Sequence, residues 1–407
     1  MPRAGWVKPQ TDQRLSDHIS LGVLTRVFPP ELVDRVVAEA QRTEVRHRLL
    51  PARVVVYYVL GLALFAQESY EAVMRNLVEG LSWASGWAQP WNVPTKAALF
   101  KARVRLGPQP LRALFETVAA PLATATTRGG FYRGWRLMGI DGTCLDVPDT
   151  PANAAQFGRP GSGRGAGVGA FPQVRLVGLA ECGTHALIAA GLGAYSSGET
   201  TLARQVLGSL EAGMLLLADR NFYGFELWQQ AHATGADLLW RTKAGHVLPP
   251  GERLADGSYL SRLRKTVNFH MRATDVTVRV IDYGLDDPGR PQAEPRYRLI
   301  TTILDPDVAP AAELAALYPQ RWEFETALDE LKTHQRGPRV VLRSKMPDGV
   351  TQEIYGYLCV HYAIRWLMHT VALDTDTDPD RLSFTRTLRA ARRSTASHPG
   401  FSPSHSR

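Results

Sequence analysis

Two aspartates in this chain directly follow short apolar segments. Asp141 comes after WRLMGI, and Asp219 comes after GMLLLA. Apolar runs of this length between turn residues are typical of buried strands, and α/β sheets place their ligands at the carboxyl ends of strands. One aspartate in this position is commonplace, because aspartate also favours turns and caps. Two of them favour a shared carboxylate site.

A helical segment further along the chain adds the groups that such a site lacks. At 100° per residue, four polar side chains share one arc of about 60° on this helix: Tyr318, Arg321, Glu325 and Lys332. They suit a phosphodiester lying over a metal ion that a carboxylate holds. Asp329 lies on the same face, so the helical spacing leaves both carboxylates open as the ligand. An amphipathic helix with i,i+4 ion pairs would give the same pattern.

The spacing Y-x2-R-x3-E-x6-K resembles the Y-R-E-K motif of insertion sequence 4 family transposases. IDGT at Asp141 resembles the surroundings of the family's first catalytic aspartate, and LADRNFYG at Asp219 resembles those of its second. The long interval between Asp219 and Glu325 resembles the strand-rich insertion that this family carries there. The resemblance covers residues 135 to about 372 well and the helical N-terminal region more loosely.

The resemblance implies a DDE transposase with an α/β, RNase H-like core. Asp141, Asp219 and Glu325 would be the catalytic residues and would hold two divalent metal ions, which stabilise the attacking and leaving oxygens. Oxygen-only ligands favour Mg²⁺ or Mn²⁺ over zinc. Tyr318, Arg321 and Lys332 would bind phosphates at the cleaved transposon end.

The implied partners are double-stranded DNA, both as terminal inverted repeats and as target, and a second copy of the chain in a homodimer on DNA. The reaction would be cut-and-paste transposition: hydrolysis of one strand, hairpin formation by its 3′-OH, hairpin opening and strand transfer. Two alternatives remain at this stage. One is an RNase H-like nuclease without strand transfer, and the other is an inactive DNA-binding relic or regulator.

The order of apolar patterns predicts an RNase H-like mixed sheet, interrupted by a β-rich insertion and preceded by an all-helical region. Three strands are followed by helix, strand, helix and strand from about residue 135. We expect a helical N-terminal DNA-binding domain (1–125), the two parts of the catalytic core (130–245 and 306–373), the β-rich insertion (246–305) and a basic C-terminal tail (374–407).

The insertion departs from the family pattern in its aromatic residues. Family members can stack a tryptophan of the insertion on a flipped base, but residues 242–320 contain no tryptophan. Their tyrosines and phenylalanine are Tyr259, Phe269, Tyr283, Tyr297 and Tyr318, of which the first four lie before the motif helix. Base–aromatic stacking by one of those four would be worth about 1–3 kcal/mol.

The basic excess is mostly arginine. The 407 residues include 47 Lys+Arg against 39 Asp+Glu, a net charge of +8, and 40 of the 47 basic residues are arginine. Arginine pairs bidentately with phosphate, so this balance fits a nucleic-acid partner, although GC-rich coding bias would also produce it.

Residues 94–107 predict a helix with Thr95 as N-cap and Gly107 as its stop, and the next helix would complete a helix-turn-helix. The basic residues of this segment are split between two sides of the helix, which weakens that interpretation. The candidate DNA contacts are Lys96, Lys101, Arg103 and, beside the second aspartate, Arg220.

The remaining patterns predict a cytoplasmic bacterial protein associated with the nucleoid and not with a membrane. The three cysteines are scattered, which argues against a disulfide framework or a cysteine zinc site. We see no secretory signal, and the apolar run Val54–Ala66 is too short to span a bilayer. The glycine-rich residues 158–169 lack the Lys-Ser/Thr of a phosphate-binding loop.

Overall fold

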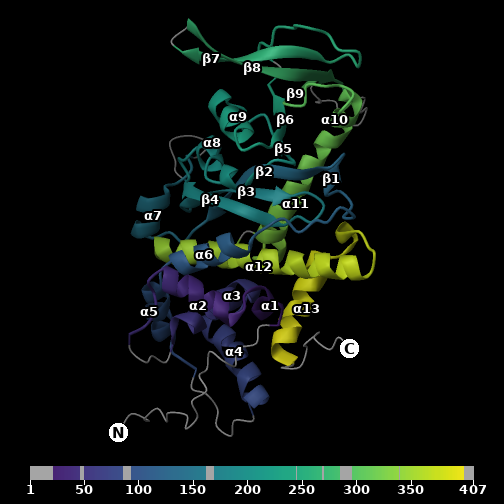
Figure 1. The fold of residues 1–407 in the computed structure, drawn as a ribbon. Coiled ribbons are helices and arrows are strands. Elements are labelled where there is room, and N and C mark those ends of the chain that lie inside the picture. Colours follow the sequence, from purple (N-terminus) through teal and green to yellow (C-terminus); the bar gives the residue numbers. More distant parts are fainter. Residues whose placement is uncertain are drawn as a thin grey trace, which may run out of the picture.

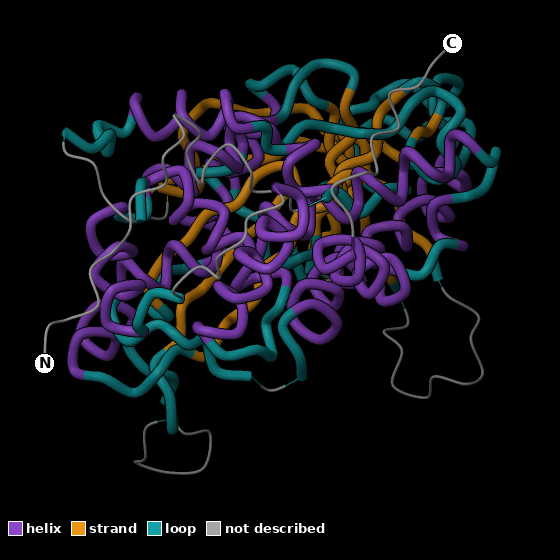
Figure 2. Tube along the Cα trace, turned by 90° about the horizontal axis from the view of Figure 1, so that it is seen from below, coloured by secondary structure: helices purple, strands orange, loops and turns teal. Residues whose placement is uncertain are grey.

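One mixed sheet runs through the middle of the molecule, with helices below it and on both of its faces (Figure 1). The computed structural model describes residues 22–45, 50–85, 93–161, 169–243, 245–267, 270–284, 296–338 and 340–397. Seen from below, the strands run between and behind helices (Figure 2). No helix of the described residues is long and apolar enough to cross a membrane.

Strand β2 (Trp135–Asp146) organises the sheet. It pairs antiparallel with β3 on one side and parallel with β5 on the other, and the sheet order is β4-β3-β2-β5-β6-β9-β8-β7. The other core strands are β1 (Phe131–Tyr132), β3 (Gln173–Glu181), β4 (Leu187–Ala194), β5 (Met214–Ala218) and β6 (Asp237–Thr242). The order β4-β3-β2-β5-β6 is that of an RNase H-like core, so the predicted fold class is confirmed.

The region after β6 adds strands to the same sheet. These are β7 (Tyr259–Val267), β8 (His270–Tyr283) and β9 (Tyr297–Thr301). β9 pairs antiparallel with β6, and β8 with β9, so the core sheet continues into this region without a break. Alternating apolar residues indicated β8 and β9, whereas the basic stretch of β7 hid its strand pattern.

Helices cover the two faces of the sheet unequally. α8 (Glu199–Ala203) and α9 (Phe225–His232) pack on one face, against Met138 and Ile140 of β2. α10 (Ala311–Leu317) packs on the other face, against Leu137, and α11 (Trp322–Asp329) continues from it. Because strand side chains alternate, Gly139 and Asp141 share the α10–α11 face with Leu137.

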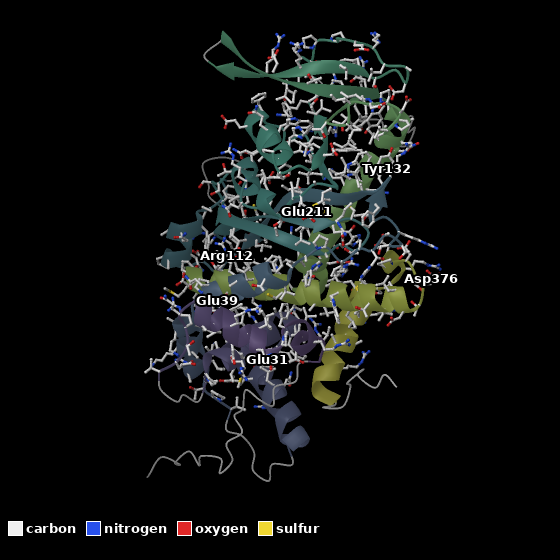
Figure 3. The ribbon with its side chains drawn as sticks, in the orientation of Figure 1. Glu31, Glu39, Arg112, Tyr132, Glu211 and Asp376 are labelled. Carbon is white, nitrogen blue, oxygen red and sulfur yellow. The ribbon has the colours of Figure 1, made fainter. Side chains whose placement is uncertain are left out.

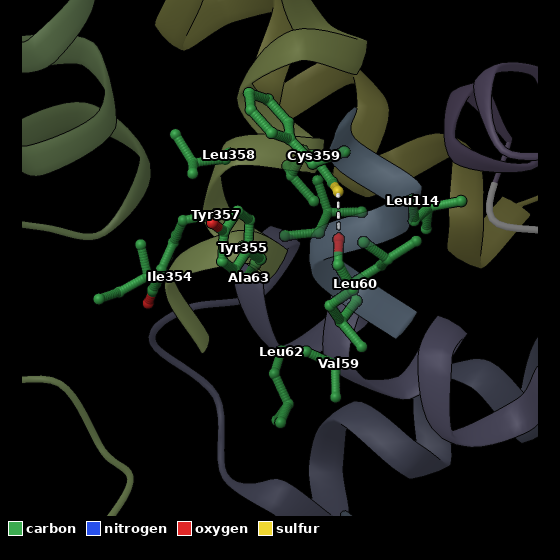
Figure 4. Close-up of a cluster of buried hydrophobic side chains, with 14 of the residues drawn as sticks. Val59, Leu60, Leu62, Ala63, Leu114, Ile354, Tyr355, Tyr357, Leu358 and Cys359 are labelled. Atoms are coloured by element: carbon green, nitrogen blue, oxygen red, sulfur yellow. Dashed lines mark hydrogen bonds between the residues drawn. The ribbon is translucent and has the colours of Figure 1, made fainter. Parts of the chain in front are cut away.

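The predicted N-terminal helical region consists of α1 (Val23–Val27), α2 (Pro30–Glu39), α3 (Ala52–Leu64), α4 (Tyr70–Ser85), α5 (Lys96–Leu106) and α6 (Gln109–Val118). α3 is buried on all sides, as its apolar run predicted. It packs on α12 (Pro347–Asp374), and the two helices share the apolar cluster of Figure 4. Gly356 permits this contact, because a Cβ there would lie 3.1 Å from Val59 Cγ1.

The end of the described chain packs back onto these helices. α12 is followed by the 3₁₀ turn η5 (Pro379–Arg381) and by α13 (Phe384–Ser397). Leu388 and Ala391 of α13 are buried, and the Arg392 guanidinium donates to the Leu64 carbonyl at 2.6 Å. The start of the basic C-terminal segment is therefore a packed helix, while residues 398–407 lie outside the described residues.

A buried ion pair fastens the segment after α11 to α12. This segment, η4 (Glu330–Gln335), is a π-helix. Arg365 Nε donates to Glu330 Oε2 at 2.8 Å, and His361 Nε2 lies 3.2 Å from the same oxygen. Burial alone would raise the pKa of Glu330, but hydrogen bonds from His185 and His361 and the charge of Arg365 hold it far below its usual range.

We predict that Arg365→Leu lowers the free energy of unfolding by about 3–5 kcal/mol, because it leaves the Glu330 carboxylate buried without its counter-charge. Urea denaturation followed by circular dichroism measures the change. The control is Arg386→Leu, at an exposed position of α13, which we expect to change stability by about 0.5 kcal/mol or less. Equal effects of the two substitutions would contradict this role for the ion pair.

Candidate active site

Asp141 and Asp219 are neighbours where strand β5 ends: Asp219 directly follows β5, whereas Asp141 lies in the middle of β2, which continues to Asp146 instead of ending before the aspartate as expected. In the parallel pair β2–β5, Ile140 is opposite Ala218, so the next residue of each chain segment is an aspartate. Asp141 Oδ1 accepts a hydrogen bond from the Gly142 amide at 2.7 Å, and Asp219 Oδ1 accepts one from the Asn221 amide at 2.7 Å. The strand register therefore makes the two aspartates neighbours, as their positions after two apolar segments led us to expect.

The four motif residues on the facing helical segment approach the same edge. Tyr318 and Arg321 lie on the 3₁₀ turn η3 (Tyr318–Arg321), Glu325 on α11, and Lys332 on the π-helix η4. The Tyr318 hydroxyl donates to the Ala218 carbonyl at 3.2 Å, directly before Asp219. Lys332 Nζ donates to Thr143 Oγ1 at 2.8 Å, two residues beyond Asp141.

The Arg321 guanidinium lies between two of the carboxylates. Its Nη1 is 3.5 Å from Asp141 Oδ2, and its Nη2 donates to Glu325 Oε1 at 3.0 Å. The Arg321 side chain is only 8% exposed, and its Nε has no hydrogen-bond partner among the described residues. One buried cation thus joins the carboxylate on β2 to the carboxylate on α11.

Asp141 is the most perturbed carboxyl of this group. The pKa of Asp141 is raised to about 6, mainly by burial and to a smaller degree by the charges of Glu325 and Glu199. The Gly142 amide and Arg321 act in the opposite direction without cancelling the burial. A cation bound at Asp141 would therefore stabilise a carboxylate that the protein itself stabilises incompletely.

Two glycines let α11 come this close to the sheet. A Cβ on Gly139 would lie 3.2 Å from Phe324 Cβ, and a Cβ on Gly178 would lie 3.1 Å from Phe324 Cζ. Gly178 is the register partner of Asp141 on β3. Because Phe324 precedes Glu325, its contact with the two glycines determines how far Glu325 stands from Asp141.

Glu199 is a further acidic side chain at this edge that the sequence analysis missed. It begins α8 on the opposite face of the sheet, and a Cβ on Gly142 would lie 3.0 Å from its Oε1. Glu199 is the first residue of the short helical segment ETTLA, and no recognisable sequence motif surrounds it. The glycine after Asp141 was the available signal, because it leaves room for a neighbouring side chain.

The two carboxylates left open by the helical spacing have different surroundings. Glu325 contacts Arg321 and acts electrostatically on Asp141. Asp329 Oδ1 accepts a hydrogen bond from Thr333 Oγ1 at 2.6 Å, and Asp329 Oδ2 lies 3.4 Å from His334 Nε2. These contacts favour Glu325 as the member of the carboxylate group.

The candidate DNA contacts outside the motif differ in exposure. Lys96 and Lys101 are exposed on α5, and Arg220 is half-buried beside Asp219. Arg103 is a correction: it is buried, and its guanidinium donates to Ser344 Oγ and to the Gly349 carbonyl, both at 3.0 Å. α12 covers the C-terminal part of α5, so Arg103 joins helices instead of facing DNA, although it shares a helix side with Lys96.

The aromatic residues of the strand-rich region also differ in burial and in their contacts. Tyr259 is buried, and Phe269 lies outside the described residues. Tyr283 and Tyr297 stack with ring centroids 5.5 Å apart, and the Arg241 guanidinium lies 4.5 Å from the Tyr297 ring. This pair is half-buried.

The donor set suits a hard divalent cation. Asp141, Asp219 and Glu325 offer only carboxylate oxygens, which Mg²⁺ and Mn²⁺ prefer. Asp141 is incompletely stabilised, and Glu325 is 55% exposed and free to turn toward an incoming ion. These residues therefore fit a divalent metal site.

Comparisons with known proteins point to one family. Residues 136–362 match the family described as Transposase DDE domain, and residues 18–116 match Insertion element 4 transposase N-terminal. The chain is 29% identical over 381 residues to the transposase InsG for insertion sequence element IS4 of Escherichia coli strain K12. That match covers 92% of this chain and 83% of the relative.

A second relative from the same organism is the putative transposase InsZ. It is 26% identical over 258 residues, which cover 62% of this chain and 83% of that protein. Among solved structures, the piggyBac transposase synaptic complex with hairpin DNA aligns with a TM-score of 0.48 and 12% identity, over 92% of this chain and 79% of that chain.

We predict that Gly139→Val lowers the free energy of unfolding by about 1–3 kcal/mol, because the added side chain overlaps Phe324 and pushes α11 from the sheet. Urea denaturation measures the loss, and hydrogen exchange should speed up at the α11 amides. Gly208→Ala is the control, because a Cβ at Gly208 meets no atom within 4 Å. Unchanged exchange in α11 would contradict the proposed contact.

Proposed function

This chain belongs to the DDE-domain transposases of the insertion sequence 4 family, and we propose that it moves its element by cut-and-paste transposition. Transposases of this kind are enzymes that act on DNA. We propose terminal inverted repeats and a target duplex as substrates, and a homodimer, on nucleoid DNA, as the active assembly.

The observation that carries the proposal is the meeting of Asp141, Asp219 and Glu325 at one sheet edge, with Arg321 between two of them. We assign these three carboxylates as the catalytic metal ligands. DDE transposases use divalent metal ions, and we propose two ions of Mg²⁺ or Mn²⁺. When bound, the ions supply charge stabilisation at the attacking and leaving oxygens of the phosphodiester.

Arg321 has two tasks in this proposal. Without metal, its guanidinium compensates the charges of Asp141 and Glu325. Once a cation takes over that compensation, the same guanidinium is free to donate to a DNA phosphate, for which its fork geometry is suited. The Nε–H group of Arg321, which has no hydrogen-bond partner among the described residues, is a further donor for a phosphate oxygen.

Tyr318 and Lys332 frame the same phosphate path. Tyr318 is anchored at the end of β5 beside Asp219, and Lys332 is anchored at Thr143 beside Asp141. Lys332 is half-buried, so its ammonium can exchange the Thr143 hydroxyl for a phosphate oxygen with little loss of hydration. We propose that these two residues and Arg321 orient the scissile phosphate, and that Lys96, Lys101 and Arg220 contact DNA further away.

The domain assignment follows the same proposal. We assign residues 1–125 to DNA binding, 130–245 and 306–373 to the catalytic core, 246–305 to the strand-rich insertion and 374–407 to a basic tail. The strands of the insertion are hydrogen-bonded to the core through β6 and β9, so a DNA contact on the insertion would be rigidly placed relative to the carboxylates.

We predict that Glu325→Gln abolishes cleavage of a labelled transposon end while Asp329→Asn keeps it. The first change removes a metal ligand and several kcal/mol of transition-state stabilisation, which corresponds to a rate loss of about a thousandfold. The second removes a carboxylate that bonds only to Thr333 and His334 in the described chain. Cleavage is measured on denaturing gels in Mg²⁺, and an active Glu325→Gln with a dead Asp329→Asn would reverse the assignment.

Asp141→Asn should lose cleavage to a similar degree but bind the DNA end as tightly as the unchanged protein, because the basic surfaces remain. Gel-shift titration in Ca²⁺ gives the binding constant, and single-turnover cleavage in Mg²⁺ gives the rate. Asn keeps the shape of the side chain and its acceptor for the Gly142 amide. Cleavage at the normal rate would refute Asp141 as a ligand.

Products separate transposition from simple nuclease action. With Mg²⁺ and a fragment carrying the cognate inverted repeats, we expect hairpinned ends followed by joined target products, because each step needs the same carboxylates and a retained 3′-OH. Native and denaturing gels resolve hairpins, nicks and joined DNA. Nicks alone from active protein would favour the plain nuclease, and binding without any cut would favour the inactive regulator.

A further inference from the structure

A second group of metal-ligating side chains lies on the other side of α11. Glu323 is two residues before Glu325, and two residues of helix turn a side chain by about 200°. His185, in the turn between β3 and β4, and Asp380, on η5, meet Glu323 there. One ligand atom from each lies within 4.8 Å of the other two.

His185 points into this group with an unused nitrogen. Its side chain is only 7% exposed, and its Nε2 has no hydrogen-bond partner among the described residues. Nε2 lies 3.3 Å from Asp380 Oδ1 and 3.8 Å from Glu323 Oε2. A buried imidazole nitrogen that faces two carboxylates without a hydrogen bond has the surroundings of a metal ligand.

The local charges leave room for a divalent cation. The Arg365 guanidinium is engaged with the Glu330 carboxylate. In the described chain, Glu323 accepts a hydrogen bond from the Gly183 amide. The ionisable side chain that lies between Glu323 and Asp380 is His185. Two carboxylates and a neutral imidazole balance a divalent cation, whereas a singly charged imidazolium leaves one negative charge over.

We propose that His185, Glu323 and Asp380 bind one divalent cation of the zinc class, separate from the catalytic ions. Imidazole nitrogen selects zinc-like transition metals over Mg²⁺ or Ca²⁺. Three protein ligands leave a tetrahedral ion one position for water, and Asp380, with 44% of its side chain exposed, opens that position to solvent.

The surroundings of His185 support binding through Nε2. That binding leaves the proton on Nδ1, which faces Glu330 Oε1 at 3.9 Å, and a carboxylate behind a ligating histidine is a common arrangement. In the structure, Arg365 Nη2 donates to Nδ1 as well as to Glu330 Oε1, so binding an ion through Nε2 requires Nη2 to move away from Nδ1. Arg365 keeps its Nε bond to Glu330 in that shift.

The ion would join three segments that are distant in sequence. They are the β3–β4 turn, the first turn of α11 and the segment after α12, whose loop carries Asp376 in Figure 3. A ligand that binds only the folded chain stabilises it. Zinc should therefore raise the melting temperature and hold the start of α11.

The test uses the full chain carrying Asp141→Asn and Glu325→Gln, which removes two of the three proposed catalytic metal ligands. After dialysis against chelator, the protein is incubated with limiting ZnCl₂ and desalted, and its zinc content and melting temperature are measured. We expect about one zinc per chain and a raised melting temperature. Adding Asp380→Asn or His185→Gln should remove both effects.

Asp374→Asn, an exposed carboxylate at the end of α12, is the matched control and should keep the zinc. Zinc retained in both site variants, or absent from the parent protein, would overturn the proposal. Loss of zinc from Asp374→Asn as well would show diffuse acidic binding and would also overturn it. If His185→Gln fails to fold by circular dichroism, the half-exposed Asp380→Asn decides alone.

Discussion

The arrangement depends on one guanidinium that lies between like charges. Two carboxylates that share one site repel each other, and each disfavours the charged form of the other. Arg321 contacts both Asp141 and Glu325 and offsets this repulsion, so β2 and α11 can hold their acidic residues at one edge. Its single charge does not compensate Asp219 and Glu199 as well. Asp219 and Glu199 add further carboxylate oxygens at these strand ends, and such oxygens are the ligands that divalent cations such as Mg²⁺ prefer.

The helical segment that carries the motif departs from regular α-helical geometry in two places, and these departures bring its side chains to the sheet. The 3₁₀ turn at Tyr318–Arg321 has three residues per turn, so these two side chains eclipse and face the same strand ends. The π-helix at Glu330–Gln335 then turns Glu330 inward to Arg365 while Lys332 reaches Thr143. π-helical turns are frequent at functional sites, because they redirect single side chains.

Much of the architecture was predictable, because the alternation of apolar and polar residues reports burial directly. The core strands, the buried α3 and the neighbourhood of Asp141 and Asp219 followed from that pattern, whereas the RNase H-like strand order followed from the family resemblance. Contacts between distant segments could not be predicted, because no local sequence pattern records them. Arg103 carries the same charge as Lys96, and only the packing of α12 makes it a buried link. Glu199 likewise approaches Gly142, the residue after Asp141, from the other face of the sheet.

Three consecutive residues of α11 show how one helical turn can serve separate tasks. Since each step turns the side chain by about 100°, Glu323, Phe324 and Glu325 point in three directions. Phe324 packs into the space left by two glycines, Glu325 contacts Arg321, and Glu323 faces His185. A displacement of the helix therefore changes all three contacts together. The packing of Phe324 thus governs both acidic sites, although Phe324 itself has no chemical group to offer either.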